Sequence, residues 1–227
     1  MTECLRAAQA LHDHLARRHL RDGSLAGPDY GVRLNYRVGR FVKSYLRRIP
    51  WRDNLVYEQA QGYWILACSR LQERDGRNRL ELVERCADGI LRRQRADGSW
   101  AYPNPAWRGR VATAEGTWAA IGLLEAAQLL DDDRPLAGAQ AWHSFLEERI
   151  GFRAVDGGLA VNYFAGRPGG AVPNNSAFVL RFLAGLARAT GNDGHLARCR
   201  ELIAFLASIQ RPTGELPYSV PHSATEG

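Results

Sequence analysis

A nine-residue segment that ends a predicted helix occurs twice in this chain, at 94–102 and 210–218, and it restricts the fold more than any other feature. The copies read QRADGSWAY and QRPTGELPY, so Gln, Arg, Gly and Tyr recur at the same spacing. Shorter versions of the turn, DGSL and DGGL, occur at 22–25 and 156–159. A turn that recurs at intervals of some tens of residues indicates one supersecondary unit used several times. The sequence therefore predicts a repeat architecture.

The repeated units are predicted to be helical, because apolar residues recur about every 3.6 positions along most of the chain. Strand-like alternation is confined to short pieces such as 159–163. The helix near 38–49 interrupts the regular alternation of the others, so that either Pro50 kinks one longer helix or this segment lies across the end of the molecule. We predict one all-α domain over 1–227, with helices at about 3–20, 38–49, 53–74, 78–95, 112–131, 135–150, 174–190 and 193–210.

Two kinds of helix alternate along the chain. Residues 112–130 and 176–187 are apolar on nearly every side, which is typical of a helix surrounded by protein. Residues 78–95 and 193–210 carry Arg and Glu on one face and apolar side chains on the other, which is typical of an outer helix. The pattern predicts helical hairpins arranged in an inner and an outer layer.

Long and short connections alternate as well. The long ones fall at about 96–111, 151–173 and from 211 onward. In antiparallel hairpins every second connection lies at the same end, so these three loops are expected to share one rim. Long loops gathered on one side of a scaffold are where binding and catalysis usually occur.

An outer helix, then Gln-x-x-x-Gly-x-Trp at 94–100, then an inner helix resembles the α/α-toroid superfamily. That superfamily contains the six-hairpin glycosidases, polysaccharide lyases and uronosyl epimerases, together with the terpenoid cyclases and protein prenyltransferases. Gln94 is expected to bond helix-end groups, Gly98 to turn with positive φ, and Trp100 to pack between hairpins. The resemblance implies more hairpins than the roughly four expected here. The ring is therefore expected to be open, truncated at the C-terminus, or completed by association into a homo-oligomer.

Charge and cysteine usage exclude several classes of protein. The net charge is +6, but the arginines are scattered over many helices, which disfavours a nucleic-acid-binding face. No apolar run is long enough to cross a bilayer, and charges at the N-terminus disfavour a secretory signal. Four cysteines without a CxxC pair predict reduced thiols in a cytoplasmic protein. Histidine and cysteine pairs are too sparse for a zinc site, so we expect no metal and no cofactor.

The second long loop leads to Glu115, an acidic residue in an otherwise apolar helix. A buried Glu is costly unless it is paired or used, and Arg110 is one candidate partner. Gln61 has a similar position, because QGYW at 61–64 is similar to EGTW at 115–118. The alternative is that these side chains form a buried hydrogen-bond link between helices, and both interpretations stay open. The other substrate-binding candidates on these loops and helix starts are Tyr57, Tyr102, Trp107 and Tyr218.

The third long loop carries Tyr163 and Arg167 and leads into Pro-Asn-Asn-Ser at 173–176. Tyr163 is a candidate proton donor or acceptor, and Arg167 is a candidate clamp for a carboxylate. The Asn-Asn pair is first interpreted as an N-cap, and otherwise Asn174 and Asn175 bind substrate. The pair resembles the start of an inner helix in some polysaccharide lyases, where a His follows and this chain has Ser.

These residues favour a carbohydrate-active lyase, epimerase or hydrolase that acts on an acidic or uronate-containing glycan, with Tyr163 and Glu115 as catalytic residues. One alternative is a terpenoid-cyclase-like or prenyltransferase-like toroid that binds an isoprenoid. Its acidic motif is missing, however, because Leu130 precedes the Asp-Asp-Asp run at 131–133, and a solvated turn is the preferred interpretation of that run. A further alternative is a non-enzymatic protein-interaction module.

Overall fold

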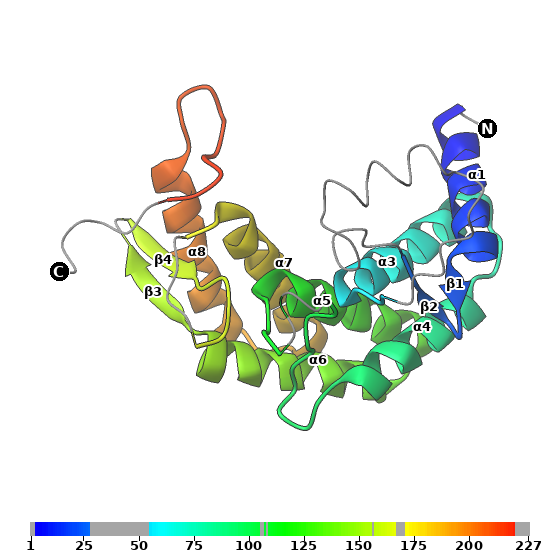
Figure 1. The fold of residues 1–227 in the computed structure, drawn as a ribbon. Helices are drawn as coiled ribbons and strands as arrows, with labels where there is room; N and C mark the ends of the chain where they lie inside the picture. Colours follow the sequence, from blue (N-terminus) through cyan, green and yellow to red (C-terminus); the bar gives the residue numbers. More distant parts are fainter. Residues whose placement is uncertain are drawn as a thin grey trace, which may run out of the picture.

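The computed structural model describes residues 3–27, 55–104, 107, 109–155, 157–166 and 171–220, and it is dominated by helices (Figure 1). The predicted all-α class is confirmed, while the segment at 38–49 and Pro50 lie outside the described residues. The α-helices are α1 (Glu3–Arg18), α3 (Glu58–Asp75), α4 (Leu80–Arg93), α5 (Thr113–Leu130), α6 (Asp133–Phe145), α7 (Pro173–Thr190) and α8 (Gly194–Ile209).

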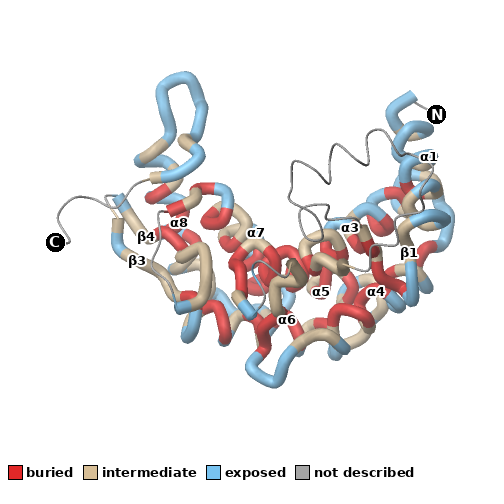
Figure 2. The backbone as a smooth tube through the Cα atoms, viewed as in Figure 1, coloured by how far each residue is buried: buried red, intermediate tan, exposed pale blue. Residues whose placement is uncertain are grey.

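The helices form two layers along an arc. Three hairpins, α3/α4, α5/α6 and α7/α8, follow one another, and their first helices pack side by side, α3 against α5 and α5 against α7 (Figure 1). Helix α5, which is apolar all round, is buried over most of its length (Figure 2). Helix α4 keeps a charged outer face that includes the exposed Glu84 and Arg85. The predicted alternation of inner and outer helices is confirmed within the described residues.

Two short antiparallel hairpins interrupt the helices. Strands β1 (Leu20–Arg21) and β2 (Ser24–Leu25) pair after α1, and β3 (Phe152–Val155) pairs with β4 (Gly158–Val161) between the hairpins α5/α6 and α7/α8. The strand-like alternation near 159–163 therefore corresponds to β4, whereas β1 to β3 were not predicted. Helix α6 continues into a π-helical turn (Leu146–Ile150) that ends at Gly151.

The repeated helix-end segment has the same structure in both copies. Gly98 has φ +85° and Gly214 has φ +87°. The side-chain amide of Gln94 donates to the carbonyl of Gly98 at 2.9 Å, and that of Gln210 donates to the carbonyl of Gly214 at 2.9 Å. The shorter copies turn in the same way, since Gly23 and Gly157 have φ +81° and +90°. The left-handed glycine predicted from the sequence is confirmed.

Each of the first three turns also lies against the outer helix of the next hairpin. A Cβ atom on Gly98 would lie 2.3 Å from the carbonyl oxygen of Ala141 in α6. A Cβ on Gly23 would lie 2.6 Å from the carbonyl oxygen of Arg85 in α4, and one on Gly157 would lie 2.5 Å from Cβ of Ser208 in α8. The turn therefore requires glycine both for its backbone angle and for its packing.

Replacing Gly98 with Ala is expected to destabilise the fold by about 1–2 kcal/mol more than replacing Gly214 with Ala. Both positions have positive φ, which costs a residue with a side chain about 1 kcal/mol. Only Gly98 has a neighbouring backbone in the way, because nothing lies within 4 Å of a Cβ on Gly214. Urea denaturation of both variants measures the difference. Equal losses in the free energy of unfolding would show that the close contact between Gly98 and α6 adds no cost.

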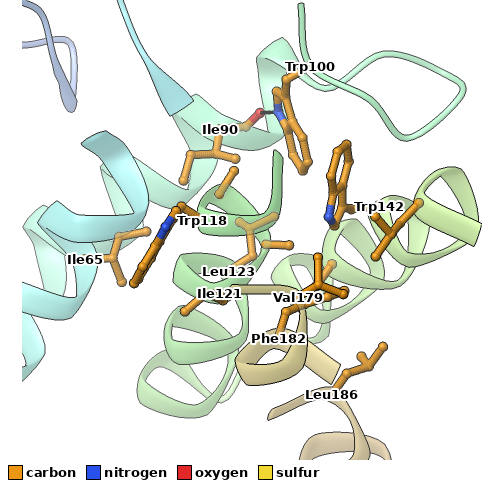
Figure 3. Close-up of a cluster of buried hydrophobic side chains, with 14 of the residues drawn as sticks. Ile65, Ile90, Trp100, Trp118, Ile121, Leu123, Trp142, Val179, Phe182 and Leu186 are labelled. Carbon is orange, nitrogen blue, oxygen red and sulfur yellow. Dashed lines mark hydrogen bonds between the residues drawn. The ribbon is translucent and has the colours of Figure 1, made fainter. Parts of the chain in front are cut away.

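The core lies between the two layers, and tryptophans fill much of it (Figure 3). Trp100 packs against Trp142 of α6, as expected for a residue between hairpins, and its indole N–H donates to the carbonyl of Ile90 at 3.0 Å. Helices α3 and α5 approach closely at two glycines, since a Cβ on Gly62 would lie 1.9 Å from the carbonyl oxygen of Trp118 and one on Gly122 would lie 2.7 Å from Cα of Gly62. This contact aligns the first turns of the two inner helices, where the candidate site lies.

Candidate active site

The long loops meet at the end of the molecule where α3, α5 and α7 begin, which we call the rim. The backbone of Ala112 pairs with that of Phe164, and the N–H of Thr113 donates to the carbonyl of Tyr163 at 3.0 Å. The fourth loop joins the third, because Ala171 pairs with Val220. The prediction that these loops share one rim is confirmed.

Glu115 lies at the third position of α5, only 2% exposed, and its carboxylate bridges to α3. One carboxylate oxygen accepts the backbone N–H of Glu58 at 2.6 Å, and the N–H of Gln59 also bonds to this carboxylate. The first N–H groups of a helix have no partner within the helix, so the carboxylate satisfies them. Burial nevertheless raises the pKa of Glu115 to about 7, and the negative charge of Glu58 adds to the shift. Glu115 can therefore hold or release a proton near neutral pH.

A second buried carboxylate, Glu58, opens α3 beside Glu115 and was not predicted from the sequence. Arg93 of α4 donates to both of its oxygens, from Nε at 2.5 Å and from Nη2 at 3.0 Å. Arg93 also donates to Oγ of Ser24 at 2.9 Å. Burial raises the pKa of Glu58, while the Arg93 guanidinium opposes that shift. The available sequence signal was an acidic residue in the first turn of an inner helix, the same feature that singled out Glu115.

Aromatic side chains gather on the loops of the rim and at the start of α3. Tyr57, which precedes α3, contacts Tyr102 edge-on at 5.7 Å between ring centroids. Trp107 stacks on Phe164 at 5.4 Å, and 39% of its surface is exposed. Arg110 was one candidate partner of Glu115, but its guanidinium lies instead over the rings of Trp107 and Phe164, at 4.6 Å and 5.5 Å. That expectation was wrong, because the N–H groups of α3 satisfy Glu115 and the stacked rings hold Arg110.

Tyr163 joins this aromatic group from the third loop. Its ring contacts Phe164 at 4.5 Å between centroids, and the residue is half-buried. Burial raises its pKa above the ordinary value for tyrosine, and Tyr218 adds to the shift. Tyr163 is therefore a neutral phenol at physiological pH. Tyr218 itself is 83% exposed.

Gln61 is fully buried, and its amide is bonded to backbone groups. Its NH2 group donates to the carbonyls of Leu25 and Tyr57 at 2.9 Å each, and its oxygen accepts the N–H of Leu25 at 2.8 Å. Gln61 thus holds strand β2 against the start of α3. The similarity of 61–64 to 115–118 does not carry over to the packing. Trp64 stacks on His12 of α1, whereas Trp118 contacts Tyr63 and Phe178 on the other inner helices.

The start of α7 differs from the N-cap that Pro-Asn-Asn-Ser predicted. The helix begins at Pro173, and the residue before it, Val172, makes no side-chain cap. Ser176 bonds elsewhere, because its hydroxyl accepts the N–H of Val161 in β4 at 3.2 Å. Asn174 is exposed, whereas Asn175 is buried and its NH2 group has no hydrogen-bond partner among the described residues. Asn175 has the same position in α7 as Glu115 has in α5, third from the helix start.

Other candidates lie outside this group. Arg167 lies outside the described residues. The acidic run at 131–133 forms the turn between α5 and α6, where the Asp132 carboxylate accepts the N–H of Arg134 and pairs with its guanidinium, so the preferred interpretation as a solvated turn is confirmed. In the described part of the chain no three potential metal ligands cluster, all four cysteines are free thiols, and no helix is long and apolar enough to cross a membrane.

A cavity of about 790 Å³ lies between α1 and α3, away from the rim. Its lining is mainly apolar and includes Leu5, Leu11 and Trp64. The two buried carboxylates do not line it, so the candidate site remains the rim.

No protein-family model matches the sequence, and neither does any curated protein. Solved structures do match the fold. A family 76 glycoside hydrolase from a bovine Bacteroides thetaiotaomicron strain has a TM-score of 0.66 at 16% identity, over 96% of this chain and 45% of that one. Unsaturated glucuronyl hydrolase from Bacillus sp. GL1 has 0.60 at 21% identity, over 83% of this chain and 56% of that one. Endoglucanase Cel10, a family 8 glycosyl hydrolase from Klebsiella pneumoniae, has 0.61 at 14% identity, over 92% of this chain and 62% of that one.

The chain spans about half the length of these structures. At such low identity the likeness concerns the fold, and the helix order, the two layers and the repeated turn agree with it. This chain has an α/α-toroid fold similar to that of these glycoside hydrolases, with its hairpins arranged along an open arc.

Proposed function

We propose that this chain is the catalytic part of a carbohydrate-active enzyme that hydrolyses an acidic, uronate-containing glycan at the rim. The observation that carries the proposal is Glu115, a buried carboxyl group with a pKa near neutrality among exposed and half-buried aromatic rings. Perturbed carboxyl groups in such surroundings are typical of acid–base catalysts. The names of the structural neighbours, which include glycoside hydrolases and a glucuronyl hydrolase, support the same class of reaction.

In the proposed reaction Glu115 acts as the general acid. It donates its proton to the glycosidic oxygen while the bond between that oxygen and the anomeric carbon breaks. Water then adds its hydroxyl to the anomeric carbon, and its remaining proton restores the Glu115 carboxyl group. We take Glu58 as ionised because Arg93 donates to both of its oxygens, and the charge of Glu58 raises the pKa of Glu115. Two carboxylates with different environments thus take different roles.

Tyr163 is assigned as a hydrogen-bond or proton donor. A lyase or an epimerase needs a base that removes a proton from carbon, and a tyrosine serves as one when its pKa is lowered. Burial shifts the pKa of Tyr163 in the opposite direction. This favours hydrolysis by Glu115 over elimination or epimerisation by Tyr163.

The rest of the rim is proposed to bind the substrate. Tyr57, Tyr102 and Trp107 offer ring faces to sugars, and Asn175 offers a buried NH2 group that has no partner in the described part of the chain. Arg110 is held in place by stacking, and together with Arg167 it is proposed to bind the uronate carboxylate.

Incubation of the protein with a panel of uronate oligosaccharides, their neutral counterparts and polyprenyl diphosphates tests the proposal. We expect release of new reducing ends from an acidic oligosaccharide, without the unsaturated product that a lyase forms and that absorbs in the ultraviolet. An unsaturated product would show that the rim catalyses elimination, as a lyase does. Binding of polyprenyl diphosphate without binding of any oligosaccharide would show that the ligand is an isoprenoid and not a glycan. Turnover of neutral oligosaccharides alone would support the proposed hydrolysis but contradict the proposed uronate substrate.

A further inference from the structure

The three inner helices present matching positions on the face that they share. The sixth residue of each helix is aromatic, namely Tyr63 in α3, Trp118 in α5 and Phe178 in α7. Their rings touch in sequence, with 4.2 Å between the centroids of Tyr63 and Trp118 and 5.1 Å between those of Trp118 and Phe178. An aromatic strip thus crosses the wall just inside the rim.

Further along the helices the same wall forms a groove of about 320 Å³. All three inner helices line it, and its lining includes Leu66 and Arg70 of α3, Ile121 and Glu125 of α5, and Arg181 and Arg188 of α7. Glu125 lies ten residues beyond Glu115 on α5, which corresponds to about 15 Å along the helix axis. We call this surface the inner wall. It continues from the rim, because the same helices carry both.

Two guanidinium groups of the groove, those of Arg181 and Arg188, form no ion pair with another described residue. Arg70 is paired with Glu73 at 2.9 Å, and Glu125 accepts a hydrogen bond from Ser69 at 2.5 Å. Arg181 lies over the ring of Trp118 at 5.1 Å, and in the described part of the chain neither it nor Arg188 forms an ion pair. Both are exposed and lie seven residues apart on one helix, so two turns place them on the same face about 10 Å apart.

We propose that the inner wall binds the chain of an acidic polysaccharide beyond the cleavage point, with Arg181 and Arg188 holding two carboxylates spaced along the sugar chain. Guanidinium groups bind carboxylates in a planar, bidentate geometry, and two of them in line match a ligand with repeated carboxylates. Within the strip, the exposed Tyr63 and the half-buried Phe178 offer ring surface to the sugars between the rim and the arginines, whereas Trp118 is buried beneath Arg181. A single small anion would need neither the second arginine nor the strip. The inference rests on the proposed function for the location of the cleavage point, but the binding surface stands on its own contacts.

Direct binding measurements separate this proposal from the proposed function. Titration calorimetry of the native protein with a long oligogalacturonate and with its carboxyl-reduced, neutral form is expected to show tighter binding of the acidic chain, by a margin that shrinks as salt is added. The double variant Arg181→Gln/Arg188→Gln is expected to bind the acidic chain about tenfold more weakly and the neutral chain unchanged. A control variant with the same change in charge, Arg92→Gln/Arg200→Gln, alters exposed arginines on the outer helices and is expected to bind like the native protein.

The outcomes distinguish binding at the inner wall from the proposed hydrolysis at the rim. Loss of acidic-chain binding in the Arg181/Arg188 variant alone supports the inner wall, whether or not the protein cleaves the chain. Equal affinity of the two double variants, equal affinity for acidic and neutral chains, or no binding of either would overturn it. Cleavage of oligosaccharides that persists with equal affinity in both variants would leave the proposed function in place without the inner wall.

Discussion

Glu115→Gln is expected to lower kcat on a cleavable acidic glycan by about 10²–10⁴-fold, the usual contribution of a general acid. Glutamine has nearly the same shape, and its side-chain oxygen can still accept the N–H of Glu58, so the link between α5 and α3 remains. What the variant lacks is a proton to donate to the leaving oxygen. The expected loss is therefore in kcat, with a smaller change in KM.

The pH dependence of the native enzyme identifies the same group. Because the protonated form of Glu115 is the active one, kcat is expected to fall as the pH rises through about 7. Glu84→Gln, a matched exchange at an exposed position of α4, is expected to keep both the rate and this profile. Native turnover in a folded Glu115→Gln variant would remove Glu115 from the mechanism and leave it only the role of a link between helices.

A comparison of the stabilities of Glu115→Gln and the native protein reports the protonation of Glu115 without any substrate. A free glutamate titrates near 4.5, whereas Glu115 in the folded protein titrates near 7, so the folded state holds the proton more tightly than the unfolded state between these values. This stabilising contribution is fully present below pH 4.5 and is lost as the pH rises through about 7. The stability of Glu115→Gln relative to the native protein is therefore expected to rise between about pH 5 and pH 8.

Much of the architecture was predictable from local patterns. The helix period, the helix-ending glycines and the repeated turn are properties of short segments, and each reappears in the structure, as in the bonds from Gln94 to Gly98 and from Gln210 to Gly214. The side on which the long loops meet follows from the alternation of loop lengths, and the pairing of Ala112 with Phe164 confirms it. Patterns of this kind depend on the order of elements along the chain and on local geometry.

The partners within the site were not predictable in the same way. Arg110 is close to Glu115 in sequence, yet its guanidinium lies on Trp107 and Phe164, which come from two different loops. Ser176 bonds to strand β4 instead of capping α7. Which donor reaches which acceptor depends on how the layers pack, and the sequence carries no periodic signal for that. The pairing of Glu58 with Arg93 was not predictable for this reason, since Arg93 lies on another helix.

Arg93→Met is expected to lower the free energy of unfolding by about 3 kcal/mol near pH 8. Removing one partner of a buried ion pair typically costs about 3–5 kcal/mol, because the other charge stays buried and unpaired. The lower end applies here, since the side chain of Arg93 is 32% exposed although that of Glu58 is only 4% exposed. Chemical denaturation at about pH 8 and pH 5 measures the effect. The loss is expected to shrink at the lower pH, where protonation of the unpaired Glu58 removes its buried charge.

A second substitution distinguishes the lost charge pair from lost packing. Glu58→Gln/Arg93→Met removes both charges of the pair and is expected to recover most of the stability that Arg93→Met loses at pH 8. The pair also sets the acidity of Glu115, because the charge of Glu58 raises its pKa. With that charge neutralised, the alkaline limb of kcat in the double variant is expected to move to lower pH. A double variant as unstable as Arg93→Met, with an unmoved pH profile, would show that Arg93 contributes packing to the rim and that Glu58 does not tune the proposed acid.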